Sequence, residues 1–329
     1  MKIFRSNIFL FCLCIALAVQ VFIAFETPIG GSFSDAVQLS MNGVQAVTPV
    51  KATLVSVDSI GELFKDLYGE PGHINLSGKS LVSYGSFTSF AKGDVLVMSI
   101  AYNPSTKAFD LVDVIRENPI MTFPMIQGLG ELGRNILFHV PMSMVAFIAF
   151  VIGTIYSILY LVKRNYDYDR QARAASAGGF LFTLMATVTG SIWARFSWGT
   201  FWNWDPREIS IFILLLVYMA YFMLRSLLEE SEDKKARIAA VYNIIGMISA
   251  FFLMFILPRI TQSLHPGGGS LVGKGAEAPL LNLSGKTHID RTLSNMQWIS
   301  VILFLFVFLW IKDIYTRILR LQDKRAEEI

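Results

Sequence analysis

The sequence predicts an all-α polytopic membrane protein with six transmembrane helices and one inserted, small extracytoplasmic β domain. Hydrophobic residues make up 53% of the 329 residues and charged residues only 16%, a balance unlike that of soluble domains. The apolar residues gather in six runs of about the length that a helix needs to cross a bilayer. A long segment between the first two runs has a water-soluble composition. No extended basic or acidic tract is present, so nucleic acid is not an expected partner.

The first apolar run extends from Ile8 to Phe25 and follows two basic residues, Lys2 and Arg5. It is longer than the core of a usual signal peptide, and no small-residue cleavage pattern follows it. We therefore expect residues 1–25 to form a retained first transmembrane helix. Cys12 and Cys14 would point to different faces of this helix, so neither a disulfide nor a two-thiol metal site is expected.

Residues 26–134 are predicted to form the β domain. They are rich in Ser, Gly, Val and Asp, and they contain no run long enough to cross a bilayer. Alternating or β-branched segments predict a compact antiparallel β domain or a small barrel. These segments are Val44–Val57, Ser80–Phe90, Asp94–Tyr102 and Ala108–Ile115.

Three shorter features lie within the predicted β domain. Asn103-Pro104-Ser105-Thr106 is typical of a turn, which would join the last two strands. Ser59–Tyr68 favours a short helix. His73 lies in a Gly- and Pro-containing segment, so we expect an exposed loop histidine.

Residues 135–329 are predicted to form a five-helix membrane domain. Its spans, most of them without charge, are Ile136–Val162, Gly178–Ala194, Ile209–Leu227, Ala239–Leu257 and Gln297–Ile311. With the first run they total six, so both termini lie on one side. The four stretches on that side hold two, four, four and five Lys or Arg residues, fifteen together, against six in the two short opposite loops. Because positive residues favour the cytoplasmic side, both termini are predicted to be cytoplasmic and the β domain external.

Tryptophan is concentrated in one predicted external loop, residues 193–208. Four of the six tryptophans lie there, interleaved with Arg195 and Arg207. Anchoring at the membrane interface is an ordinary role for one or two tryptophans. Four of them among charged residues indicate a surface for a flat, aromatic ligand.

Two histidines are predicted to lie at the same membrane face as these tryptophans. His139 begins the second span, and His265 follows the fifth and precedes the glycines 267–269, which would let the backbone bend. A lone histidine there is most often an interfacial side chain. Two imidazoles from separate helices, however, can bind the iron of a heme from both sides, while tryptophan rings stack on the macrocycle and arginines pair with its propionates.

The segment Trp198–Glu208 resembles a known signature. Its sequence, Trp-Gly-Thr-Phe-Trp-Asn-Trp-Asp-Pro-Arg-Glu, is similar to the tryptophan-rich "WWD" signature of the heme-handling proteins of cytochrome c biogenesis. This family includes the CcmC, CcsA and CcmF types. The order of spans, the His-Val-Pro that opens the second and the Leu-His after the fifth most resemble the CcmC type. The resemblance covers about Asn135–Trp310.

The resemblance implies a multi-pass protein of the bacterial inner membrane that binds heme b at the periplasmic face and delivers it for cytochrome c maturation. The implied partners are a CcmE-type periplasmic heme chaperone, ABC transporter subunits and apocytochrome c. It also implies no catalytic residue. The implied iron ligands are His139 and His265. The other implied heme-binding residues are Trp193, Arg195, Trp198, Gly199, Trp202, Trp204, Asp205 and Arg207.

Two departures from the CcmC type leave an alternative within the family. Pro206 and Glu208 after Asp205 are more typical of the CcsA and CcmF types, and a minimal CcmC lacks the β domain. The alternative is a CcsA-like component of a heme lyase that attaches heme directly to apocytochrome, with His288 as a further candidate participant.

Two other classes of function remain as hypotheses. A quinone oxidoreductase would use heme for electron transfer, but such proteins generally place paired histidines inside their spans, and here no histidine lies mid-span. A scaffold without a cofactor would use the tryptophan-rich segment only to bind a protein partner.

Overall fold

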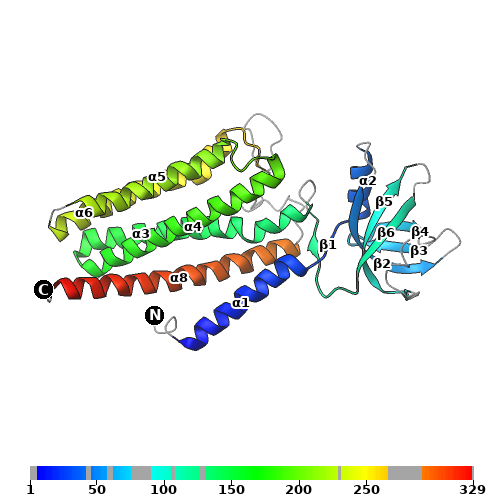
Figure 1. Cartoon of the computed structure of the whole chain (residues 1–329), viewed down its shortest axis with the longest axis horizontal. Coiled ribbons are helices and arrows are strands. Elements are labelled where there is room, and N and C mark those ends of the chain that lie inside the picture. The colour runs from blue at the N-terminus through cyan, green and yellow to red at the C-terminus, as the bar shows by residue number, and fades with distance from the viewer. Residues whose placement is uncertain are drawn as a thin grey trace. The chain divides into compact units, whose positions relative to one another are not determined.

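The computed structural model divides the chain into two compact units (Figure 1). One contains Met1–Gln20 and Asn135–Ile329, and the other contains Val21–Arg134. The structure describes residues 6–41, 46–57, 62–75, 90–104, 108–125, 130–228, 231–265 and 291–327.

The first unit is a helical bundle. Its helices are α1 (Asn7–Glu26, which runs on into the second unit), α3 (His139–Lys163), α4 (Tyr166–Trp198), α5 (Pro206–Leu227), α6 (Glu232–Phe251), α7 (Leu257–Ile260) and α8 (Arg291–Glu327). The short 3-10 helix η2 (Gly130–Leu137) leads into α3, and the π-helical turn η3 (Phe252–Ile256) joins α6 to α7. Within the described part of the chain, six helices are long and apolar enough to span a membrane. The chain is a multi-pass membrane protein.

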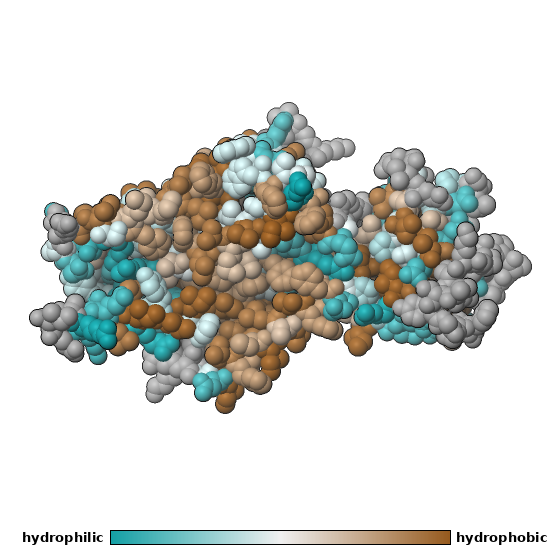
Figure 2. Space-filling model, viewed as in Figure 1, coloured by the Kyte–Doolittle hydropathy of each residue, from teal (hydrophilic) through white to brown (hydrophobic). Residues whose placement is uncertain are grey.

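The surface of the helical unit agrees with this assignment. Hydrophobic residues cover its flank, and hydrophilic residues gather at the end where α8 terminates (Figure 2). Large apolar side chains such as Ile248, Val162 and Leu227 are more than half exposed. In lipid these side chains have an apolar surrounding, so their exposure needs no protein partner.

The helices extend beyond the predicted spans. α4 begins twelve residues before the predicted Gly178 (178 − 166), and α8 continues sixteen residues beyond the predicted Ile311 (327 − 311). At the start of α4 the side chain of Asn165 accepts a hydrogen bond from the backbone N–H of Asp167 at 2.8 Å. Hydropathy identifies only the apolar part of a helix, so the polar ends were missed.

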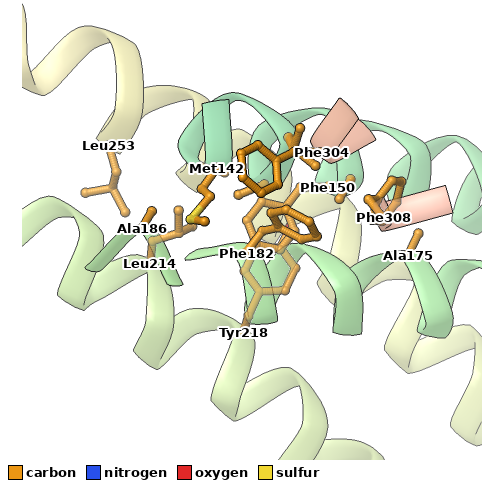
Figure 3. Close-up of a cluster of buried hydrophobic side chains, with 14 residues drawn as sticks. Met142, Phe150, Ala175, Phe182, Ala186, Leu214, Tyr218, Leu253, Phe304 and Phe308 are labelled. Carbon is orange, nitrogen blue, oxygen red and sulfur yellow. The ribbon is translucent and has the colours of Figure 1, made fainter. Parts of the chain in front are cut away.

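Aromatic side chains form the centre of the helical unit (Figure 3). Phe150 of α3 stacks on Tyr218 of α5, with ring centroids 3.7 Å apart. Phe182 of α4 makes edge contacts with Phe304 and Phe308 of α8, at 6.3 and 6.4 Å. The core therefore joins α8 to α3, α4 and α5, three helices that follow one another much earlier in the sequence.

The helix α1 packs on α8 through an apolar and a polar contact. The rings of Phe9 and Phe306 are 6.2 Å apart. The buried side chain of Gln20 donates a hydrogen bond to the buried hydroxyl of Ser300. These contacts are consistent with a retained first helix, which stays a prediction.

A charged pair is buried at the other end of the bundle from the tryptophan-rich segment. Arg225 of α5 donates two hydrogen bonds to Asp169 of α4, at 2.8 and 2.7 Å. Both residues are less than 10% exposed. Because a charge in this environment is costly without its partner, the pair fixes α4 against α5.

The second unit contains a closed five-stranded barrel in the order β2-β3-β4-β6-β5. Its strands are β2 (Val47–Val57), β3 (Glu62–Asp66), β4 (Pro71–Asn75), β5 (Val95–Asn103) and β6 (Ala108–Glu117). All neighbours are antiparallel except β4 and β6, which are parallel. β1 (Ile29–Gly30) and β7 (Phe123–Pro124) form a separate parallel pair. This strand order is that of an OB-fold barrel.

The helix α2 (Phe33–Met41) closes the barrel. The ring of Phe33 lies so close to Gly72 of β4 that a Cβ atom there would meet it at 2.8 Å. The carboxylate of Asp66 accepts hydrogen bonds from the backbone N–H groups of Phe33, Tyr68 and Glu70, at 3.0, 2.9 and 3.0 Å. One buried carboxylate thus joins the start of α2 to the turn after β3.

Several local predictions for this unit need correction. Where the structure describes the predicted helix Ser59–Tyr68, it is the strand β3 and a turn, because Phe64 and Asp66 face the interior in alternation with exposed Lys65. His73 lies in strand β4 and not in a loop. The helix α2 was not predicted. The predicted strand Ser80–Phe90 and the turn residues Ser105 and Thr106 lie outside the described residues, except for Phe90.

The buried pair gives a stability prediction. Replacing Asp169 by Ala leaves the Arg225 charge buried without its partner, so the free energy of unfolding should fall by about 3–5 kcal/mol. Thermal unfolding of the purified protein in detergent measures this change. Glu232→Gln is the control: it removes a charge from an ion pair with Lys235 in which the Glu side chain is 76% exposed, and it should change stability by less than about 1 kcal/mol. Equal effects would contradict the assignment.

Candidate functional site

The tryptophan-rich segment is the end of one helix, a short loop and the start of the next. Trp193 and Trp198 lie in the last turns of α4, so the prediction of a loop throughout 193–208 is corrected. Gly199 ends α4 with φ at 84°, a conformation that glycine adopts without strain. Pro206 begins α5. Proline suits this first position because its missing N–H would have no partner within the helix.

Asp205 and Glu208 form a reciprocal cap at the start of α5. The Asp205 carboxylate accepts a hydrogen bond from the N–H of Arg207 at 2.9 Å, while Glu208 accepts from the N–H of Asp205 at 3.2 Å. Glu208 also accepts from the N–H of Asn203 at 2.7 Å. Between these two anchored amides Trp204 has φ at 58°, which a bulky residue rarely adopts, and its side chain is 68% exposed.

Asp205 also holds the segment that contains His265. Its carboxylate accepts hydrogen bonds from the hydroxyl of Ser263 at 2.9 Å, the N–H of Leu264 at 2.7 Å and Nδ1 of His265 at 3.2 Å. The Asp205 side chain is 1% exposed. Asp205, which the resemblance implied to be a heme-binding residue, is therefore a buried anchor that joins the start of α5 to residues 263–265.

The protonation of Asp205 follows from these contacts. Burial alone would raise the pKa of this carboxyl, but the hydrogen bonds outweigh burial and hold the pKa well below its usual range. The donors include the His265 side chain, two backbone N–H groups and the Ser263 hydroxyl. Asp205 is thus an anion at neutral pH.

His265 lies between two of the predicted tryptophans. Its ring centroid is 5.7 Å from that of Trp193 and 4.9 Å from that of Trp198. The two indoles contact each other edge to face, at 4.9 Å. His265 is thus held by an anion on one side and by aromatic rings on the others.

His139 is held by α4. Its Nδ1 lies 2.9 Å from the carbonyl oxygen of Ala186 and 3.3 Å from the hydroxyl of Thr189. Gly190 is so close that a Cβ atom there would be 2.8 Å from Cε1 of the imidazole. Glycine is therefore required at this position for the ring to lie where it does.

The two histidines approach the same stretch of α4. His139 packs on Gly190, and His265 packs on Trp193, which is three residues, or about one helical turn, further along. His265 and Arg207 both lie within electrostatic range of the His139 imidazole. The structure therefore brings together His139, His265, Trp193, Trp198 and Arg207.

Within the described part of the chain, and apart from Asp205, the remaining predicted residues make no ring contact or hydrogen bond with either histidine. Trp202 contacts Trp204 and Phe212, at 6.0 and 6.3 Å between centroids. The Arg195 guanidinium donates to the Gly199 carbonyl and lies over the ring of Phe201 at 5.7 Å. His288 and the glycines 267–269 lie outside the described residues.

The geometry fits a heme with two histidine ligands. In both histidines Nδ1 contacts an oxygen atom, which favours the tautomer whose Nε2 lone pair is available to iron. Neither Nε2 has a hydrogen-bond partner among the described residues. Three buried donors near the tryptophans also lack a partner in the described part of the chain: Ser197 Oγ, Asn203 Nδ2 and Arg207 Nε. Donors of this kind suit the carboxylates of a bound heme.

Sequence reasoning missed four residues that support the site: Thr189, Gly190, Ser263 and Glu208. Thr189, Gly190 and Ser263 carry no signal without knowledge of which helices meet. The cap was detectable, because an acidic residue followed three positions later by Glu is a helix-start pattern. Asp205 and Glu208 have this spacing.

Comparison with known proteins identifies the class. The family model described as "Cytochrome C assembly protein" matches residues 95–265, which is just over half of the chain. The chain belongs to this family, as the tryptophan-rich signature indicated.

Individual relatives match over part of their length. Heme exporter protein C of Paracoccus denitrificans is 32% identical over 146 residues, which cover 44% of this chain and 60% of the relative. The corresponding protein of Rhodobacter capsulatus is 32% identical over 144 residues, covering 44% and 59%. Cytochrome c biogenesis protein CcsA of Chlamydomonas reinhardtii is 27% identical over 158 residues, covering 44% and 43%. The chain thus spans about 60% of the length of the heme exporter relatives.

The role of Asp205 as an anchor can be tested by stability. Asp205→Ala removes the cap of α5 and leaves several donors without an acceptor, which should cost about 2–4 kcal/mol. Asp205→Asn should cost clearly less, because Asn is an equally good cap and keeps one oxygen acceptor. Thermal unfolding of both variants in detergent checks this order. Equal losses would show that the contacts of Asp205 do not stabilise the segment.

Proposed function

We propose that this chain binds heme b at the periplasmic face of a bacterial inner membrane and delivers it for cytochrome c maturation. The observation that carries the proposal is the pair of histidines, each with Nδ1 against an oxygen and Nε2 available, that meet the same turns of α4. Membership of the cytochrome c assembly family and the names of the heme exporter relatives support it. The role is binding and delivery, with no catalytic residue.

In this proposal, different residues would bind the iron, the macrocycle and the propionates of heme. His139 and His265 would bind iron through Nε2, and Trp193 and Trp198, which already enclose His265, would line the macrocycle. Arg207 would pair with a propionate, because its buried Nε has no partner among the described residues. When bound, the heme supplies the iron and the macrocycle that the recipient cytochrome requires.

The topology belongs to the same proposal. We place both termini in the cytoplasm and the barrel unit, the tryptophan-rich segment and the His265 segment outside, on the strength of the Lys and Arg distribution. The partners are a CcmE-type heme chaperone, the ABC transporter subunits of the maturation system and, at the next step, apocytochrome c.

The exposed aromatic rings beside the site would contact the chaperone. Trp204 is 68% exposed and Phe201 is 59% exposed, although both follow directly after the helix that lines the heme site. The cap residues hold Trp204 in a strained conformation. An aromatic side chain kept at the surface in this way suits a docking contact.

The CcsA-like alternative keeps one point in its favour, the similarity to CcsA proteins. The Pro and Glu after Asp205, however, serve to start α5 and to complete its cap. They are explained by local structure, so they do not discriminate between delivery to a chaperone and direct attachment. Transfer of heme to purified chaperone, compared with attachment to a Cys-x-x-Cys-His peptide, separates the two roles.

The heme proposal predicts an absorption change. The protein purified after expression with ample heme should show a Soret band, and His139→Ala or His265→Ala should weaken it severalfold because each removes an iron ligand. His73→Ala, in strand β4 of the barrel unit, is the matched control and should leave the band unchanged. Absence of heme in the unaltered protein would refute the proposal.

Replacing Trp204 and replacing Trp193 should have different effects, the first on docking of the chaperone and the second on heme binding. Trp204→Ala should reduce heme transfer to the chaperone several-fold without changing heme content, because the ring is exposed and contacts only Trp202 among the described rings. Trp193→Ala should lower heme content, because its ring packs on His265. Heme titration and transfer assays measure both. Loss of heme on replacing Trp204 would mean that it lines the heme and does not dock a partner.

A further inference from the structure

The two candidate iron ligands have different hydrogen-bond partners. Nδ1 of His265 contacts an oxygen of the Asp205 carboxylate at 3.2 Å, whereas Nδ1 of His139 contacts the neutral carbonyl oxygen of Ala186 at 2.9 Å and the Thr189 hydroxyl at 3.3 Å. Nδ1 of His265 therefore contacts a full negative charge, whereas Nδ1 of His139 contacts only neutral, dipolar groups. The two histidines that would bind the same iron therefore differ in the charge of their Nδ1 partners.

A carboxylate on Nδ1 changes what an imidazole can do for a metal. It draws the proton toward itself, which increases the basicity of Nε2 and fixes the orientation of the ring. A charge-assisted hydrogen bond is also about twice as strong as one between neutral groups. As iron ligands through Nε2, His265 is therefore the stronger and better oriented one, and His139 is the weaker one.

The Asp205 carboxylate is itself fixed. Backbone N–H groups of Arg207 and Leu264 bind its two oxygens, at 2.9 and 2.7 Å, and the Ser263 hydroxyl binds one of them at 2.9 Å. Its side chain is 1% exposed. The acceptor of the His265 proton thus has no freedom to turn away, and the asymmetry is built into the fold.

We propose that Asp205 is a positioning residue that makes His265 the permanent iron ligand and leaves His139 as the ligand that dissociates when heme is handed on. This inference rests on the proposed heme binding and deepens it. A delivery protein must release its cargo, and two equally strong ligands would oppose release. An unequal pair lets one bond break while the other keeps the heme in place for the acceptor.

The reduction potential of the bound heme tests the role of Asp205. Asp205→Asn keeps an oxygen near Nδ1 and a good helix cap but removes the charge. Since anionic support favours ferric over ferrous iron, that preference should fall about tenfold in the variant, which raises the potential of this one-electron couple by about 59 mV. Ser210→Ala, which removes a hydroxyl in the first turn of α5 that bonds the Pro206 carbonyl and keeps the carboxylate on His265, should leave the potential unchanged.

A second measurement leaves Asp205 unchanged. His265→Ala should release heme at least about tenfold faster than His139→Ala, because it loses the stronger ligand. Added imidazole should restore the wild-type spectrum of His139→Ala at a lower concentration than that of His265→Ala. An unaltered potential in heme-loaded Asp205→Asn, or equal release rates from the two histidine variants, would overturn the inference. Neither outcome affects heme binding by the unaltered protein, whose absence would instead refute the proposed function.

Discussion

The site depends on one buried carboxylate. Asp205 accepts hydrogen bonds from the start of α5 and from residues 263–265, so it connects the loop after α4 with the segment after α7. Without this connection nothing among the described contacts would hold His265 against Trp193 and Trp198. The position of His265, the proposed iron ligand, therefore depends on the residue that caps a helix.

The same helix, α4, organises the other half of the site. Its carbonyl at Ala186 and its glycine at 190 receive His139, and the indoles one and two turns later receive His265. Because a helix is rigid over so short a length, the spacing of the two imidazoles is set by α4 and not by flexible loops. Under the proposed function, heme would lie against this stretch of α4 and not in the bundle core, which is filled by apolar and aromatic side chains.

The sequence predicted the membrane helices, and it singled out His139 and His265 as candidates, because both depend on local signals. Apolar runs mark spans, and His139 and His265 stand out at span ends. The support of these histidines was not predictable: Thr189 and Gly190 matter only because α3 packs on α4, and the burial of Asp205 depends on its contacts with residues 263–265. In the barrel, β3 was predicted as a helix because a short segment with two buried positions lacks a clear period.

The most direct test of the account is the electron paramagnetic resonance spectrum of the ferric, heme-loaded protein, combined with near-infrared magnetic circular dichroism. If His139 and His265 meet on the two sides of one iron, the spectrum should be low-spin and the charge-transfer band should indicate two imidazole ligands. A high-spin signal, or a low-spin signal with a ligand other than imidazole, would contradict the convergence of the two histidines on which the account stands.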